Sequence, residues 1–230
     1  MNTKATIRQF LSTTPLTLVL CLALGAAHPA LAGDGSKSEM LVFESTATSK
    51  AAGEIVVAGT SSLHDWEVVT KEIVGTLKIS APKGGEGALE LTSDLPLVTA
   101  QVSIRSESLV SGKGGMDKKM YKALETKKYK EVSFVLDSLE LAQEQSPSDS
   151  GKAASIDVLA KGKLTITDKT RRVQFPATIT WEPQKKAIAV SGEVDLRMTD
   201  FEVEPPTALL GTIKTGDEIK VSFTWTPTLK

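Results

Sequence analysis

The sequence predicts an all-β protein of antiparallel strands, arranged as a sandwich or a barrel, with one short helix. Three observations lead to this prediction. Apolar residues recur at every second position in several segments, turn-forming residues separate those segments, and one segment shows helical spacing instead. Period-2 runs produce a sheet with one apolar and one wet face, and many such strands favour a sandwich or a barrel.

The alternation is most regular near the end of the chain. Residues 188–198 place apolar side chains at every second position, and Gly192 keeps the phase of that run. Residues 219–225 alternate in the same way, as do the shorter runs 98–104 and 132–136. Each of these segments is therefore expected to be a strand with one buried face.

Turn signals separate the strands. Asp168-Lys-Thr170 predicts a hairpin, Pro183-Gln-Lys-Lys186 predicts a break, and Gly216-Asp217 precedes the last strand. Two polar stretches, residues 81–87 and 143–151, are expected to be surface loops. The sequence shows no internal repeat and no second domain.

The helical exception lies between residues 115 and 128. Met116, Met120 and Leu124 recur there at helical spacing, with lysines between them, and Asp117 near the start suits the helix dipole. In a barrel, such a helix would cover one end or pack across the mouth.

Residues 1–32 have the features of a secretory signal peptide. Lys4 and Arg8 give a positive start, residues 10–24 are mostly apolar, and Ala30-Leu-Ala32 is a small-residue cleavage site. The apolar run is shorter than the roughly 20 residues that a bilayer span needs. We therefore expect cleavage, no stable membrane span afterwards, and a periplasmic or secreted protein.

The mature chain would be residues 33–230, long enough for one domain. Taking two basic residues of the leader from 27 Lys and Arg, against 28 Asp and Glu, leaves a net charge of −3. That balance predicts no basic field for nucleic acid or an anionic membrane. The one cysteine, Cys21, leaves with the leader, and Leu20 before it argues against lipoprotein processing.

The residue types of a hydrolase occur at Ser61, Ser62, His64 and Asp65. In an extended strand Ser62 and His64 share a face while Asp65 points the other way, which is a poor arrangement for a catalytic triad. The mature chain has no other histidine and no cysteine, so a zinc site is not expected. We predict no catalytic residue, no metal site and no cofactor, and keep a lipid hydrolase or isomerase only as a third hypothesis.

Three segments carry a family resemblance. Residues 59–66 contain His-Asp-Trp, residues 161–173 form a hairpin-like stretch, and residues 198–225 contain Pro-Pro-Thr-Ala and Thr-Gly-Asp-Glu. In this order they resemble the N-terminal strand, the hairpin and the closing motif of the YceI-like lipid- and polyisoprenoid-binding family, over about residues 41–230. The hairpin departs from the family pattern at Asp168, where glycine is usual.

The resemblance implies an eight-stranded antiparallel lipocalin-like barrel around a long apolar ligand: a polyisoprenoid, a quinone-like lipid, or a fatty acid or amide. It also makes a homodimer plausible. The expected ligand-binding residues are His64, Trp66, Met116, Met120, Phe134, Phe175, Trp181, Phe223 and Trp225.

Several of these residues have two interpretations. A filled barrel alternates like a hollow one, so a cell-envelope structural or interaction module without a ligand is the alternative hypothesis. His64 is either a hydrogen-bonded structural group or a donor to a ligand's head group. Met116 and Met120 either pack the helix or form an adaptable lid. For Leu209 and Leu210 we favour anchoring of their loop over closure of the mouth.

Overall fold

The computed structural model describes residues 38–49, 52–82, 98–142 and 155–230. The expected leader at 1–32 lies outside these residues, as do the expected loop at 143–151 and most of the one at 81–87.

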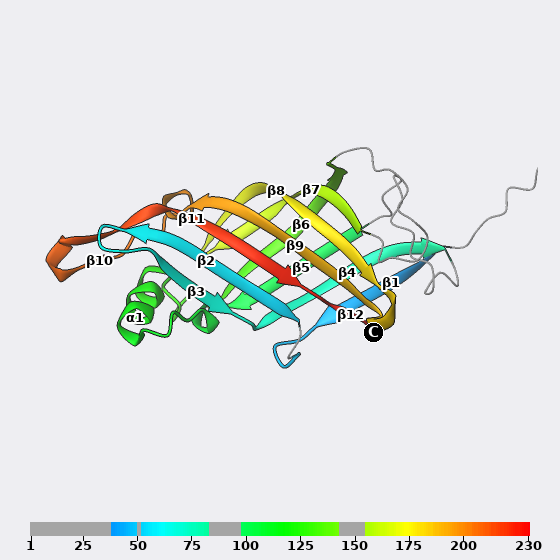
Figure 1. Cartoon of the computed structure of the whole chain (residues 1–230), viewed down its shortest axis with the longest axis horizontal. Helices are drawn as coiled ribbons and strands as arrows, with labels where there is room; N and C mark the ends of the chain where they lie inside the picture. Colours follow the sequence, from blue (N-terminus) through cyan, green and yellow to red (C-terminus); the bar gives the residue numbers. More distant parts are fainter. Residues whose placement is uncertain (1–37, 50–51, 83–97, 143–154) are drawn as a thin grey trace, which may run out of the picture. The chain divides into compact units, whose positions relative to one another are not determined.

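Antiparallel strands make up most of the described structure (Figure 1). They are β1 (Ser38–Ser45), β2 (Gly53–Ser61), β3 (Trp66–Thr70), β4 (Ile73–Pro82), β5 (Val98–Arg105), β6 (Glu131–Leu141), β7 (Ser155–Ile166), β8 (Lys169–Glu182), β9 (Ala187–Arg197), β10 (Thr207–Ala208), β11 (Ile213–Trp225) and β12 (Thr228–Leu229). The helical elements are α1 (Gly114–Ala123) and the short 3₁₀ turns η2 (Ser106–Ser108), η3 (Pro183–Lys185), η4 (Met198–Phe201) and η5 (Leu209–Gly211).

The strands form one sheet that closes into a ring. Neighbours follow the order β12-β1-β4-β5-β6-β7-β8-β9-β11-β2-β3. At one end β12 pairs with both β1 and β9, which closes the ring there. At the other end Val69 of β3 exchanges two backbone hydrogen bonds with Val110, which follows β5. The expected all-β antiparallel barrel is thereby confirmed.

Three strands of the ring are interrupted. Each interrupted strand consists of two pieces, which are β1 and β2, β3 and β4, and β11 and β12. Both pieces of a strand lie between the same two neighbours around the ring. Each end of the barrel therefore has eight strands, as expected, although the sheet contains twelve. The remaining strand, β10, adds a short edge to β11.

The side chain of Trp225 joins the three interruptions. Its indole N–H donates a 2.8 Å hydrogen bond to Ser45 Oγ at the end of β1, and Ser45 Oγ donates a 3.0 Å bond to Ile73 O at the start of β4. Both side chains are buried. A Cβ atom on Gly75 would lie 2.7 Å from Cζ2 of Trp225, so the ring occupies the space above this glycine.

Beyond this junction, toward β12, large side chains meet across the interior and form a solid end. Phe43 of β1 and Trp181 of β8 are buried and meet edge to face, with 5.9 Å between their ring centroids. Since β1 and β8 are not neighbours in the ring, the two rings meet across the barrel interior. Ile188 of β9 is also fully buried there.

Two expected elements are formed with different limits. The hairpin joins β7 to β8 through Thr167 and Asp168, and Thr167 takes the positive φ of 57° that the turn requires. The helix ends at Ala123, earlier than the expected 128, because Glu125 adopts a left-handed conformation that stops it.

The Trp225 junction leads to a stability prediction. Trp225→Phe removes the indole N–H and leaves the buried Ser45 hydroxyl without its donor, so the free energy of unfolding should fall by about 1–3 kcal/mol. Equilibrium urea unfolding measures the change. Trp66→Phe is the matched control, because its indole N–H donates to Thr60 O in an exposed setting and its loss should cost under about 1 kcal/mol. Equal losses in the two variants would refute the special role of Trp225.

Candidate functional site: an apolar cavity in the barrel

Between the solid end and α1, the barrel encloses a cavity of about 700 Å³. Its lining comes from β2 to β9, from β11 and from α1, and consists mostly of Ile, Val, Leu, Ala, Met and aromatic side chains. No Asp or Glu belongs to this lining in the described part of the chain. A concave, apolar site of this size is typical of small-molecule pockets.

The cavity brings together eight of the nine expected binding residues. They are His64, Trp66, Met116, Met120, Phe134, Phe175, Phe223 and Trp225. The ninth, Trp181, does not line the cavity, because its ring lies in the solid end against Phe43.

Glycines make room for the aromatic rings of the wall. A Cβ atom on Gly59 would lie 2.3 Å from Cζ2 of Trp66, so the indole occupies the space that a side chain on β2 would take. The same arrangement joins Phe134 with Gly162, Phe223 with Gly192, and Trp225 with Gly75. Each ring is thereby held against the wall of the barrel. The sequence pattern does not predict this role, although Gly192 shares the phase of the inward-facing residues.

Three phenylalanines form a band around part of the cavity. The ring centroids of Phe134 and Phe175 lie 5.5 Å apart, and those of Phe175 and Phe223 lie 5.5 Å apart in an edge-to-face arrangement. Such pairs add stability beyond the apolar area they bury. The band gives a ligand a smooth aromatic surface.

The turn between β2 and β3 lies at the mouth of the cavity. Ser61 Oγ donates to His64 O at 2.7 Å, which closes the turn. The ring nitrogen Nδ1 of His64 lies 2.7 Å from Asp65 O. Because a carbonyl only accepts, Nδ1 carries a proton, and in the neutral ring Nε2 is left as an acceptor. His64 is therefore both a structural group and a group able to meet a ligand.

This turn corrects one expectation. Residues 62–65 do not form an extended strand. Ser62 bonds instead to β11: its N–H donates to Lys214 O at 2.9 Å, and its Oγ accepts from Lys214 N at 3.1 Å. Ser62 and His64 are thus positioned by separate backbone contacts, and the geometry gives no support to a serine–histidine pair.

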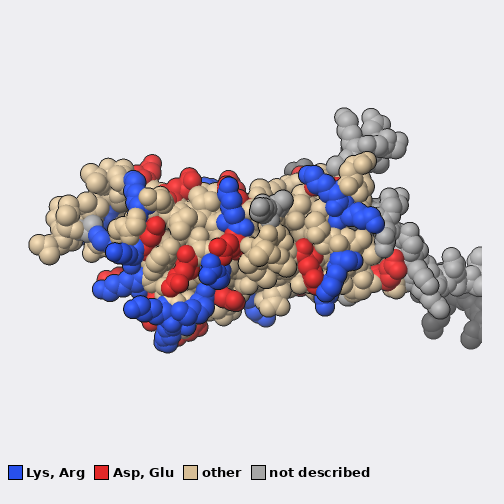
Figure 2. Space-filling view, turned by 90° about the horizontal axis from the view of Figure 1, so that it is seen from below, with Lys and Arg blue, Asp and Glu red and all other residues tan. Residues whose placement is uncertain are grey.

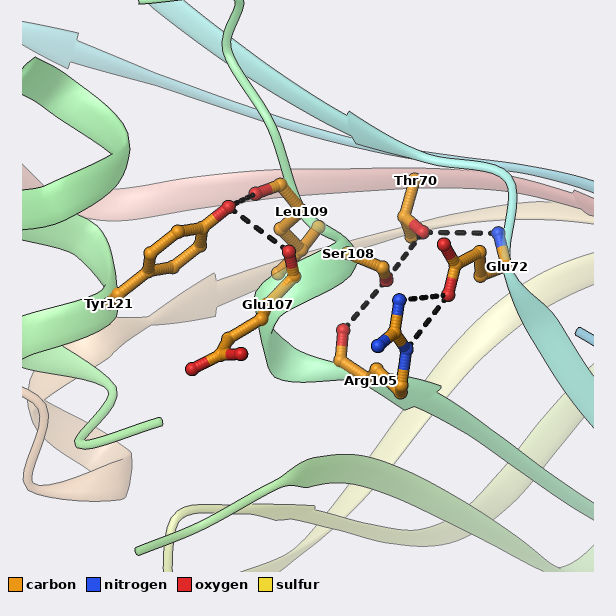
Figure 3. A network of polar contacts seen from close by, with 7 residues as sticks. All are labelled: Thr70, Glu72, Arg105, Glu107, Ser108, Leu109 and Tyr121. Atoms are coloured by element: carbon orange, nitrogen blue, oxygen red, sulfur yellow. Dashed lines mark hydrogen bonds and ion pairs between the residues drawn. The ribbon is translucent and has the colours of Figure 1, made fainter. Parts of the chain in front are cut away.

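Helix α1 lies over the mouth and is fastened by Tyr121. The phenol donates to Leu109 O at 2.8 Å and contacts Glu107 O at 3.1 Å (Figure 3). Burial, followed by the nearby carboxylates of Asp117 and Glu107, raises the pKa of Tyr121 above its usual 10.0, which keeps the donor protonated. From the same helix, Met116 and Met120 pack against the core.

The segment that receives Tyr121 is itself tied to the barrel. Figure 3 shows Ser108 donating to Arg105 O at 2.7 Å and accepting from Thr70 of β3 at 2.7 Å. Beside it, Arg105 Nε donates to Glu72 at 2.9 Å. Helix α1 is therefore attached, through Tyr121 and the segment that receives it, by backbone and hydroxyl contacts to both β3 and β5.

The expected anchoring role of Leu209 and Leu210 is wrong. Leu209 is 72% exposed and Leu210 is fully exposed. Their side chains leave the barrel, because both residues adopt left-handed backbone conformations at the tip before β11.

Asp217 secures the 3₁₀ turn η4 at the rim of the cavity. Thr199 donates from its backbone N to Oδ1 at 2.9 Å and from Oγ1 to Oδ2 at 2.7 Å. These hydrogen bonds, the side-chain one first, lower the pKa of Asp217 below its usual 3.8. The turn that they hold contributes Met198 and Phe201 to the lining.

Neither a membrane-spanning helix nor a metal-binding cluster occurs among the described residues. No helix in this part of the chain is long and apolar enough to cross a bilayer. No group of three or more His, Cys, Asp or Glu side chains in residues 38–49, 52–82, 98–142 and 155–230 is arranged to hold a metal ion.

Comparison with known proteins gives a consistent result. The family model described as the YceI-like domain matches residues 58–226. The crystal structure of BcnA from Burkholderia cenocepacia is similar with a TM-score of 0.56 at 17% identity, covering 77% of this chain and 98% of that one. A polyisoprenoid binding domain from Saccharophagus degradans, implicated in plant cell wall breakdown, gives a TM-score of 0.56 at 14% identity, covering 84% and 100%. The search of curated proteins returned no match.

The contact between a wall ring and a glycine can be tested at Gly59, where the three atoms nearest to an added Cβ all belong to the Trp66 ring. Gly59→Ala should lower the free energy of unfolding by about 1–3 kcal/mol through overpacking. In a Trp66→Leu background the same change should cost clearly less, since the opposing ring is gone. Urea unfolding of the four proteins in this cycle gives the coupling. Purely additive effects would contradict the proposed ring–glycine contact.

The Asp217 contact predicts a pH dependence. A carboxyl whose pKa is lower in the folded state stabilises the fold above its unfolded pKa, and that stabilisation is lost as pH falls through about 4 and below. Wild type should therefore be more stable than Asp217→Asn at pH 7, and the difference should shrink as pH is lowered past 4. Thermal unfolding across this range measures it, with Asp200→Asn on η4 as the control. A difference that does not change with pH would overturn the prediction.

Proposed function

Because this chain belongs to the YceI-like family, we propose that it binds a long apolar lipid inside its barrel and sequesters or carries it. The observation that carries the proposal is the enclosed apolar cavity of about 700 Å³. The structurally similar polyisoprenoid binding domain supports a prenyl chain as the first ligand class to test.

The energetics permit tight binding without a strong head-group contact. Burying apolar surface gains roughly 0.8 kcal/mol per CH₂, so a chain of about 20 carbons gains on the order of 16 kcal/mol. Association and ordering remove roughly 4–15 kcal/mol. Chain length and shape should therefore govern selection.

The orientation of the ligand follows from where polar groups lie. The apolar chain lies along the band of Phe134, Phe175 and Phe223, and the junction at Trp225 limits its depth. The head group stays at the mouth, where Nε2 of His64 accepts a hydrogen bond from a hydroxyl. The cavity supports this binding role over the filled interaction module, since the interior is not filled along its whole length.

The site of action that we propose is the periplasm or the cell exterior. The support is the leader-like sequence of residues 1–32, with its positive start and small-residue cleavage site. Sequencing the N-terminus of the protein recovered from a bacterial envelope tests this step on its own.

Cavity filling tests the binding proposal. Ala100→Phe on β5 places a ring in the lining, whereas Thr99→Phe places the same ring on the exposed face of the same strand. Displacing about two CH₂ groups of ligand from the cavity should weaken binding of a long prenyl alcohol by about tenfold. The Thr99 variant should bind like wild type in a calorimetric or fluorescence titration.

A length series sharpens the result. The loss in Ala100→Phe should be greatest for the longest prenyl alcohols and smallest for short ones, because only the long chains need the filled volume. Failure of every prenyl alcohol to saturate the wild-type protein would sink the proposed function.

A further inference from the structure

The tip between β10 and β11 presents two leucines to solvent. Leu209 and Leu210 have φ values of 47° and 56°, in the left-handed region that residues with a Cβ atom seldom adopt. Leu209 is 72% exposed and Leu210 is fully exposed. A disfavoured backbone that displays two large apolar side chains is unusual in a free surface loop, and it points to a partner with an apolar interior.

A group of lysines lies on the neighbouring helix α1 and on the residues that flank it. Residues 113–130 carry seven lysines and two acidic residues, a net charge of +5, whereas the whole chain has a net charge of −1. The rest of the chain therefore sums to −6. Among the described residues, Lys113, Lys118, Lys119 and Lys122 form no ion pair, while most lysines of the strands do.

The leucines and lysines flank one opening. Lys119 of α1 donates to Thr207 O of β10 at 3.2 Å, which joins the helix to the strand that leads into the leucine tip. Lys113, Lys119 and Thr207 also line the cavity. Figure 1 shows α1 and β10 at the same end of the barrel, and Figure 2 shows Lys and Arg side chains gathered at that end.

We propose that this mouth docks on the surface of an anionic lipid bilayer. Leu209 and Leu210 enter the boundary between head groups and acyl chains, and the lysines of α1 lie over the lipid phosphates. Apolar insertion and electrostatic attraction to anionic lipid together give peripheral binding. The mouth then faces the bilayer, so an apolar chain passes between membrane and cavity without crossing water.

Charge selects this partner over a second copy of the chain. Two copies meeting through their mouths would bring two lysine-rich helices together, and like charges facing each other disfavour that contact. An anionic bilayer offers both a negative surface and an apolar layer behind it, which match the two features of this end.

Docking on a bilayer does not require a ligand in the cavity, so it is independent of the proposed lipid binding. If the protein binds vesicles but no prenyl alcohol, docking stands and the proposed function fails. If it binds prenyl alcohols but no vesicles, the proposed function stands and docking fails. The two failures are therefore distinguishable.

The test is flotation with lipid vesicles. Protein expressed from the full chain, with its N-terminus determined, is mixed with vesicles of phosphatidylcholine alone or with 30 mol% phosphatidylglycerol added. Wild type should float with the anionic vesicles and be released by salt. Lys118→Gln with Lys122→Gln should weaken binding roughly 25-fold, since each lysine near an anionic surface strengthens it by about fivefold. Lys78→Gln with Lys230→Gln, which removes the same charge from β4 and the C-terminus, should have little effect.

The leucines have their own variant. Leu209→Asn with Leu210→Asn should weaken vesicle binding at least tenfold by removing the inserted apolar groups. Since asparagine tolerates the left-handed conformation better than leucine, this variant should fold as well as wild type. Neither leucine lines the cavity, so its prenyl-alcohol affinity should be unchanged.

Three results would overturn the proposal. The first is that wild type does not float with anionic vesicles. The second is that the Lys78 and Lys230 control pair weakens vesicle binding as much as the Lys118 and Lys122 pair does. The third is that wild type does not bind vesicles but self-associates, and that the leucine variant abolishes this self-association, which would make the tip an interface between copies.

Discussion

The structure depends on how Trp225 holds together a barrel in which three of eight strands are interrupted. Its indole links β11 to Ser45 of β1, and through Ser45 to Ile73 of β4, at the level where these strands break. The other five strands of the ring, β5 to β9, are continuous, so this junction links the three strands that break. The Trp225 junction also separates two parts of the barrel interior. Toward β12 the barrel is filled by side chains such as Phe43 and Trp181, and toward α1 it is hollow.

A second constraint keeps that half hollow. Large aromatic side chains placed inside an eight-stranded barrel would ordinarily fill it. Here Trp66, Phe134 and Phe223 each lie over a glycine of the neighbouring strand, and Trp225 lies over Gly75 of β4, so the four rings occupy the depth of the wall and leave the centre free. Helix α1 forms the remaining boundary of the cavity. It has no fully buried residue of its own, and Tyr121 fastens it to the segment between β5 and the helix. The result is an apolar space whose polar groups are gathered at one mouth.

Much of this was accessible from the sequence, and the failures have physical causes. Alternation showed which side chains face inward, as at 219–225, and family-like segments distinguished a barrel from a sandwich. Alternation carries no information on depth along the barrel axis, so Trp181 could not be separated from the cavity residues. Nor does alternation reveal that a strand is interrupted, because both pieces of the strand keep the same alternation of inward and outward side chains. Net charge likewise concealed the basic end: −3 for residues 33–230 is the sum of a lysine-rich segment at 113–130 and an acidic remainder.

Whether the hollow half of the barrel holds an apolar lipid can be measured by native mass spectrometry of the protein, gently purified from a bacterial envelope fraction. We expect a discrete added mass that is released on denaturation and is identified as a lipid with a long apolar chain. A polypeptide mass without any adduct, unchanged after incubation with prenyl and fatty lipids, would show that the cavity does not hold such a lipid.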